Sequence, residues 1–208
     1  MRLFVQLMFA IGLLAGLGPA FAAAPSERPG MGATVYQDTD GWGTTFRTWA
    51  PNADAVYVSG SFNGWATNTH PLTMEGDDLW SIDVPGVWAG HEYQFIMLND
   101  SNTHWRNDPW ARKLTSSNGK SIIVNPEQYQ WQHEMVTPNW NELVIYEMHT
   151  GTFGTSEGGP FPGNFPGVQA HLDHLQNLGI NAIELLPLNE FAGDQSWGYN
   201  PGHIFSVE

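Results

Sequence analysis

Two aromatic side chains stand close together in a short run near the carboxyl end of the chain, Ser196-Trp197-Gly198-Tyr199-Asn200-Pro201. A flat aromatic ring can stack on an apolar face of a ligand. Gly198 permits a backbone conformation that a side chain would hinder, and Pro201 stiffens the exit from the run. The run predicts either a rigid aromatic platform or a well-packed loop without a ligand, because such runs also serve as plain packing.

Five titratable residues are further candidates for chemistry. His149 ends an apolar run, where a side chain can reach the mouth of a barrel or hydrogen-bond a neighbouring loop. Glu147 and Glu184 lie inside apolar runs, so we expect buried, hydrogen-bonded structural groups rather than catalytic acids. His171 and His174 have the spacing of half a metal site, but no third ligand is suitably spaced. We therefore predict a solvated helix face there and no metal site.

These residues belong to a strand–helix–strand pattern. The apolar runs 144–149 and 182–186 predict strands, and apolar residues between them recur at helical spacing from Val168 to Leu178, with Gly179 as the stop. This order predicts a parallel βαβ unit, whose functional loops follow the carboxyl ends of the strands. The loop 150–167 contains no Lys or Arg, so a nucleotide-phosphate site is not expected.

Three ordered motifs in this half resemble the start of the barrel of the α-amylase superfamily, glycoside hydrolase family 13. They are Val144-Ile145-Tyr146-Glu147-Met148-His149, Gly179-Ile180-Asn181-Ala182-Ile183-Glu184-Leu185-Leu186-Pro187 and Ser196-Trp197-Gly198-Tyr199-Asn200-Pro201. The resemblance is to the branching-enzyme and trehalohydrolase branch. It implies that Tyr199 stacks on the sugar beside the scissile bond, and Trp197 could form a wall of that pocket.

The first half of the chain has the pattern of short strands. Residues 80–84 and 93–97 alternate apolar and polar side chains with a period of two, and Val56 and Val58 flank Tyr57. Turn-forming residues such as Asn63-Gly64 separate these runs. The pattern predicts an all-β sandwich of roughly one hundred residues.

This half also resembles carbohydrate-binding module family 48, an immunoglobulin-like domain that precedes the barrel in branching and debranching enzymes. The matching runs are Phe46-Arg47-Thr48-Trp49-Ala50-Pro51-Asn52-Ala53, Val58-Ser59-Gly60-Ser61-Phe62-Asn63-Gly64-Trp65, Gly90-His91-Glu92-Tyr93-Gln94-Phe95 and Asn107-Asp108-Pro109. The resemblance implies that Trp65 and Trp105 stack on glucan, whereas Gln94 replaces the family's sugar-binding Lys. The alternative is that both indoles are buried or pack against the barrel, as Trp usually is.

Composition narrows the classes of partner. The formal charge is −14, with only 7 Lys and Arg, so neither nucleic acid nor an anionic membrane is an expected partner. A neutral α-glucan such as starch, glycogen or a maltooligosaccharide is compatible with this surface. The absence of cysteine excludes disulfides and a cysteine nucleophile. No cofactor is predicted.

The amino-terminal residues predict export. Arg2, the apolar run 3–17 and Ala20-Phe21-Ala22 have the three parts of a signal peptide, with cleavage after Ala22 and a secreted or periplasmic product. We then expect a linker at 23–33, the sandwich at 34–127, a junction at 128–139 and barrel residues at 140–208.

The expected fold is thus a multidomain one, with an all-β immunoglobulin-like sandwich followed by the first βαβ part of an incomplete (β/α)₈ TIM barrel. A complete barrel needs about 250 residues, and retaining hydrolysis needs two carboxyl groups ~5–5.5 Å apart. The resemblance implies that those carboxylates come from later strands, so we assign no catalytic residue and expect a fragment inactive alone. The parent would be a 1,4-α-glucan branching enzyme-like hydrolase or glucanotransferase. The alternative is a non-catalytic glucan-binding protein that uses the sandwich.

Overall fold

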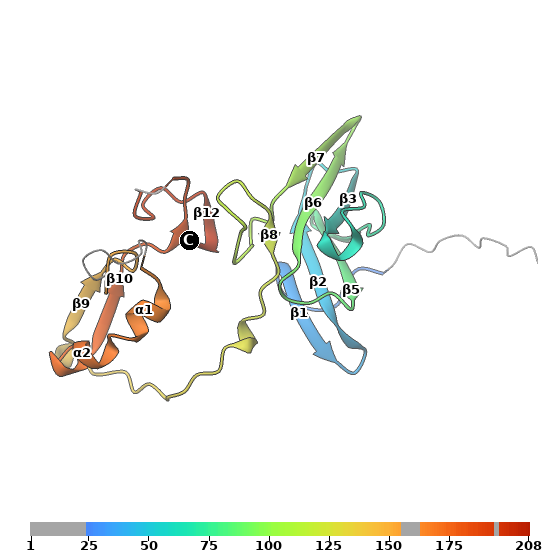
Figure 1. Ribbon diagram of the computed structural model, residues 1–208. Helices are drawn as coiled ribbons and strands as arrows, with labels where there is room; N and C mark the ends of the chain where they lie inside the picture. Colours follow the sequence, from blue (N-terminus) through green and yellow to red (C-terminus); the bar gives the residue numbers. More distant parts are fainter. Residues whose placement is uncertain (1–23, 155–162, 194–195) are drawn as a thin grey trace, which may run out of the picture.

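The computed structural model describes residues 24–154, 163–193 and 196–208. The predicted signal peptide therefore lies outside the described residues. Figure 1 shows a β-sandwich and a smaller carboxyl-terminal part joined by an extended connection. None of the helices formed by the described residues is long and apolar enough to span a membrane.

Two four-stranded antiparallel sheets form the sandwich. The first has the order β1-β2-β5-β4, and the second has the order β3-β6-β7 with β8 paired to β6. The strands are β1 (Gly32–Asp38), β2 (Gly41–Trp49), β3 (Ala55–Gly60), β4 (Thr73–Gly76), β5 (Leu79–Pro85), β6 (Glu92–Asn99), β7 (Asn102–Arg106) and β8 (Ser121–Ile122). One 3₁₀ turn, η1 (Ser61–Asn63), follows β3.

The core lies between the two sheets, and the predicted alternation is confirmed. Trp80, Ile82 and Val84 of β5 are buried, as are Tyr93 and Phe95 of β6. Because side chains along a strand point alternately to opposite faces, each sheet presents one apolar row to the other. This leaves the outer face of each sheet for polar contacts.

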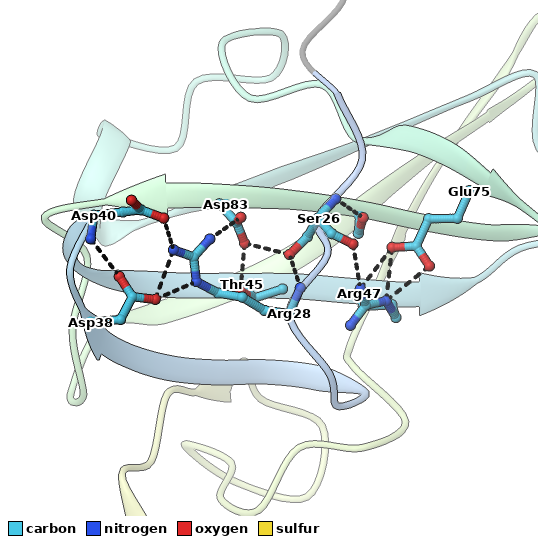
Figure 2. Close-up of polar contacts among 9 residues, drawn as sticks. Ser26, Arg28, Asp38, Asp40, Thr45, Arg47, Glu75 and Asp83 are labelled. Carbon is cyan, nitrogen blue, oxygen red and sulfur yellow. Dashed lines mark hydrogen bonds and ion pairs between the residues drawn. The ribbon is translucent and has the colours of Figure 1, made fainter.

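The segment that precedes β1, from Ser26 to Gly30, binds to the outer face of the first sheet through hydrogen bonds and ion pairs (Figure 2). Arg28 binds Asp38, Asp40 and Asp83, at 2.8, 3.2 and 2.5 Å. The buried Arg47 forms an ion pair with Glu75 at 2.8 Å and donates to the carbonyl oxygens of Ser26 and Gly30. The described residues of the predicted linker 23–33, from 24 onward, thus pack against the sandwich, and this packing supplies partners for buried donors and acceptors. The last two of them, Gly32 and Ala33, belong to β1.

The carboxyl-terminal part contains the predicted parallel strand pair. Strand β9 (Ile145–Met148) pairs with β10 (Ala182–Leu185), with Glu147 opposite Glu184. The prediction of a single helix is wrong. Two short helices form in its place, α1 (Phe165–Gln169) and α2 (Leu172–Asn177). The break follows from His171, whose N–H bonds to the carbonyl three residues back while its ring nitrogen lies 2.8 Å from the carbonyl oxygen of Gly167. Val168 and Leu175 are buried, but Leu172 and Leu178 are exposed.

A small hairpin joins this part to the sandwich. Strands β11 (Asn189–Glu190) and β12 (His203–Val207) are antiparallel. The ring of Phe205 stacks on Trp110 at 4.6 Å, and Ser206 Oγ donates to the carbonyl of Ala111 at 2.7 Å. In Figure 1, β12 lies between the two parts, so the predicted junction 128–139 is not their only link. That junction lies between the 3₁₀ turns η2 (Pro126–Gln128) and η3 (Trp140–Glu142).

Candidate functional site

The turn after η1 presents Trp65 at the surface of the second sheet. Asn63 organises this turn, because its side-chain oxygen accepts the N–H of Gly60 at 3.0 Å and its amide nitrogen lies 3.2 Å from Thr69 Oγ1. Gly64 and then Trp65 adopt positive φ angles of 63° and 62°. A positive φ costs a bulky residue of order 1–3 kcal/mol, and such strain concentrates at functional sites. The strained turn therefore marks Trp65 as a candidate binding residue.

Trp105 reaches the same surface from strand β7. It pairs in register with Ile96 of β6, and its side chain remains 37% exposed. The ring centroids of Trp65 and Trp105 are 6.4 Å apart, with planes inclined at 43°. Tertiary structure thus brings together two indoles that are forty residues apart in the sequence. Neither is fully buried, so the interpretation as plain core packing does not describe them.

Lys120 adds a cation to this pair, which sequence reasoning missed. Its Nζ lies 4.0 Å from the ring centroid of Trp65 and 3.4 Å from a carboxylate oxygen of Glu92. A cation over an indole face is held by the ring's electron density. Lys120 directly follows the turn signal Asn118-Gly119 and precedes β8, and no local sequence signal placed that turn beside Trp65.

A row of polar side chains continues from Trp105 into a cleft of about 430 Å³. Gln94 Nε2 donates to Asn107 Oδ1 at 2.8 Å, and the amide of Asn107 donates to the carbonyl of Gly119. The rest of the cleft wall comes from Arg106 of β7, from the loop residues Ser117 and Asn118, and from Ala192, Gly202 and His203 of the carboxyl-terminal part. Side-chain amides offer both donors and acceptors, so the cleft can bind a neutral ligand rich in hydroxyl groups.

Asp108 lies beneath this surface and fixes the turn after β7. Its carboxylate accepts the Tyr93 hydroxyl at 2.6 Å and the N–H of Trp110 at 2.9 Å, while its own N–H donates to Ser121 Oγ at 2.9 Å. Burial raises the pKa of Asp108 to about 6, against the lowering effect of these hydrogen bonds. The group therefore has a structural role next to the candidate site.

The second set of sequence candidates lies on the carboxyl-terminal part. Trp197 has a φ of 56° and stacks on His149 with ring centroids 5.4 Å apart. Gly198 has a φ of 80°, and a side chain there would collide with the carbonyl of Pro187, which confirms the need for glycine. Tyr199 is 65% exposed. The loop therefore positions Trp197 by packing and leaves the phenol ring of Tyr199 accessible.

Four titratable candidates take no part in a site. Glu147 and Glu184 are exposed neighbours on β9 and β10, and neither lines a described cleft, so the expectation of buried, hydrogen-bonded groups is wrong. This sheet has only two described strands, which is too few to cover either carboxylate. His171 is half-buried against Phe153 rather than solvated, whereas His174 is exposed. Within the described ranges, no group of three His, Cys, Asp or Glu could hold a metal ion.

Comparison with known proteins assigns the first half to a family. The model for carbohydrate-binding module 48, the isoamylase N-terminal domain, matches residues 30–111. Among curated proteins, a 1,4-α-glucan branching enzyme of Photobacterium profundum is 30% identical over 202 residues, and one of Picrophilus torridus is 31% identical over 196. These alignments cover 91% and 93% of this chain. The chain spans only 28% and 27% of those enzymes.

Solved structures agree with this result. A putative α-amylase from Salmonella typhimurium has a TM-score of 0.69 at 32% identity, covering 85% of this chain and 28% of its own. A type I pullulanase from Bacillus subtilis, solved in complex with maltose, has a TM-score of 0.66 at 26% identity. That match covers 88% of this chain and 28% of the pullulanase. Both matches extend past the sandwich into the carboxyl-terminal part, because the sandwich alone is a smaller share of the chain.

Proposed function

We propose that the sandwich of this chain, an N-terminal carbohydrate-binding module 48 domain of an enzyme of the α-amylase superfamily (glycoside hydrolase family 13), binds α-glucan for an enzyme acting on that polymer. The matched relatives are branching enzymes and pullulanases, so the parent enzyme would cleave or transfer α-glucosidic bonds. In the retaining mechanism one carboxylate attacks the sugar and forms a covalent glycosyl-enzyme, while the second carboxyl group protonates the oxygen of the departing group.

The observation that carries the proposal is the surface formed by Trp65, Trp105 and Lys120 beside the amide-lined cleft. The exposed indole of Trp105, beside Trp65, offers a flat apolar face to a pyranose ring, and the amides of Gln94 and Asn107 can bind the hydroxyl groups of the sugar. Lys120 supplies a positive charge to this surface from a different segment of the chain, because Gln94 replaces the family's sugar-binding Lys. A neutral ligand suits a chain with a formal charge of −14.

The carboxyl-terminal part supports the finer proposal that a (β/α)₈ barrel begins here. A parallel strand pair connected through helices is the repeating unit of such a barrel. In that setting Tyr199 stacks on the sugar next to the reacting bond, with Trp197 as a wall. Export to the periplasm or medium, favoured by the apolar run 3–17, would direct the enzyme to external α-glucan.

Titration of the full 208-residue chain with maltoheptaose, followed by calorimetry, tests the binding surface. Trp105→Ala should weaken binding at least tenfold, equivalent to about 1.4 kcal/mol, because it removes a stacking face. Trp105→Phe keeps a smaller ring and should lose less. Trp49→Ala is the control, since Trp49 is also an exposed indole but lines a different depression. Equal affinities for all four proteins would refute the site.

The proposed role of Tyr199 has to be tested in an enzyme whose chain continues the barrel beyond Glu208. There, Tyr199→Ala should lower kcat/KM on α-glucan about 10- to 100-fold, or about 1.4–2.8 kcal/mol of transition-state stabilisation. Tyr199→Phe keeps the ring face and should cost much less. Two substitutions with the same effect would contradict stacking.

A further inference from the structure

A second pair of indoles lies on the other sheet of the sandwich. Trp42 is on β2, and Trp88 follows β5, with ring centroids 5.8 Å apart and planes at 84°. Together with Gln37 they line a depression of about 330 Å³. Trp65 and Trp105, by contrast, are carried by the second sheet and the turn after β3. The two pairs therefore occupy different surfaces.

The backbone on each side of this second pair is fixed. The N–H of Gly86 donates to the carbonyl of Trp42 at 3.0 Å, and Thr44 Oγ1 donates to the carbonyl of Val87 at 2.8 Å. Val87 is itself buried in the core. Because both main-chain segments are held, the rings need little ordering when a ligand binds, and such preorganisation favours affinity.

Packing does not account for the exposed surface of these rings. Trp42 is 50% exposed, although Thr44, two residues further along β2, is fully buried and Val87, next to Trp88, is buried. Gln37 is the register partner of Trp42 across β1 and β2, so its amide lies beside the indole. The surface thus combines two apolar faces at a right angle with one uncharged group that donates and accepts hydrogen bonds.

The charges nearby select against an ionic ligand. The lining residues carry no charge, and the neighbouring carboxylates Asp38 and Asp40 already bind Arg28. An anion would meet those carboxylates, and a cation would find no free carboxylate in the depression. The remaining ligand class is a neutral one that has apolar faces and many hydroxyl groups.

We infer that Trp42, Trp88 and Gln37 form a second carbohydrate-binding platform that takes another segment of the same α-glucan chain. The inference rests on the proposed function only for the identity of the sugar. The surface chemistry of the Trp65–Trp105 pair recurs here, with two indoles and an adjacent glutamine. Since a polymer presents identical units along its length, two platforms on one rigid domain raise its apparent affinity without any new type of contact.

The test compares pairs of substitutions in the full chain by electrophoresis through gels containing glycogen. Trp42→Ala with Trp88→Ala should raise the apparent dissociation constant about tenfold, through loss of the second attachment. Trp65→Ala with Trp105→Ala should also weaken binding, and all four substitutions should abolish it. Trp49→Ala, an exposed indole with no described ring partner, is the control. Circular dichroism verifies the fold of each variant.

A second measurement uses the unaltered chain, so it does not depend on whether a variant folds. On addition of maltoheptaose, the indole N–H resonances of Trp42 and Trp88 should shift, while cellohexaose should leave them in place. Unshifted resonances, together with wild-type mobility of the Trp42/Trp88 variant, would overturn the inference even if Trp65 and Trp105 proved essential. If the unaltered chain were a dimer and the Trp42/Trp88 variant a monomer, the indole pair would be a subunit interface, and this result would also overturn the inference. Binding lost only in the Trp42/Trp88 variant would instead refute the proposed function and leave this inference intact.

Discussion

The buried carboxyl group of Asp108 makes a specific prediction about stability and pH. Its side chain is fully buried, and its pKa rises from 3.8 to about 6 because burial disfavours the charged form. The Tyr93 hydroxyl, which donates to this carboxylate, is the largest influence in the opposite direction. At neutral pH the native protein therefore carries an ionised group that its surroundings disfavour.

The sign and size of the effect follow from the shift. A carboxyl group whose pKa is raised by folding binds its proton more tightly in the native state than in the unfolded state. Its stabilising contribution is complete below about pH 4 and is lost as the pH rises through about 6. A shift from 3.8 to about 6 corresponds to about 3 kcal/mol.

The assay is urea unfolding of the wild type and of Asp108→Asn at pH values from 4 to 7. Other carboxylates titrate in both proteins, so the difference between the two free energies of unfolding isolates residue 108. Asn lacks the charge, and it replaces one acceptor oxygen with a donor in a site that faces Tyr93. We expect Asp108→Asn to be destabilising at pH 4 and its cost to fall by about 2 kcal/mol at pH 7.

Tyr93→Phe provides the matched variant. Removal of the hydroxyl takes away the hydrogen bond that lowers the pKa of Asp108, so the pH at which stability is lost should move upward. A cost of Asp108→Asn that is constant from pH 4 to 7, or that increases toward pH 7, would refute the reasoning.

Three other outcomes are expected. Arg47→Ala should lower the free energy of unfolding, measured by urea titration, by about 3 kcal/mol because it leaves the Glu75 carboxylate without its ion pair. Arg28→Ala should lower it less, because the Arg28 side chain is more exposed. Gly198→Ala should speed amide hydrogen exchange in residues 196–201 because the new methyl collides with the Pro187 carbonyl, whereas Gly193→Ala, with no atom near its side chain position, should have a smaller effect. The purified 208-residue chain should release no reducing sugar from glycogen above a heat-killed control, because the family resemblance implies that both carboxyl groups needed for retaining hydrolysis come from later strands; measurable turnover would contradict this.

The sequence alone determined the sandwich, the parallel strand pair and the candidate aromatic residues. Alternation along 80–84 and 93–97 predicts inward-facing side chains because a strand has a period of two. Of these, Trp80, Ile82, Val84, Tyr93 and Phe95 are buried and Met97 packs against the core while partly exposed. Gly198 was predicted from the same kind of local steric argument, and its φ of 80° confirms it. Such features depend on neighbours within a few residues, which the sequence presents directly.

Tertiary structure decided the features that depend on contacts between distant residues. Lys120 approaches Trp65 only because β8 pairs with β6, and Trp42 meets Trp88 only because β2 pairs with β5. The helix predicted from 168 to 178 breaks where the His171 ring bonds to the Gly167 carbonyl and contacts Phe153. Likewise, Glu147 and Glu184 are exposed because a two-stranded sheet has too few neighbours to cover them. Apolar periodicity indicates which face of an element can be buried, but burial itself requires a partner that only the folded chain supplies.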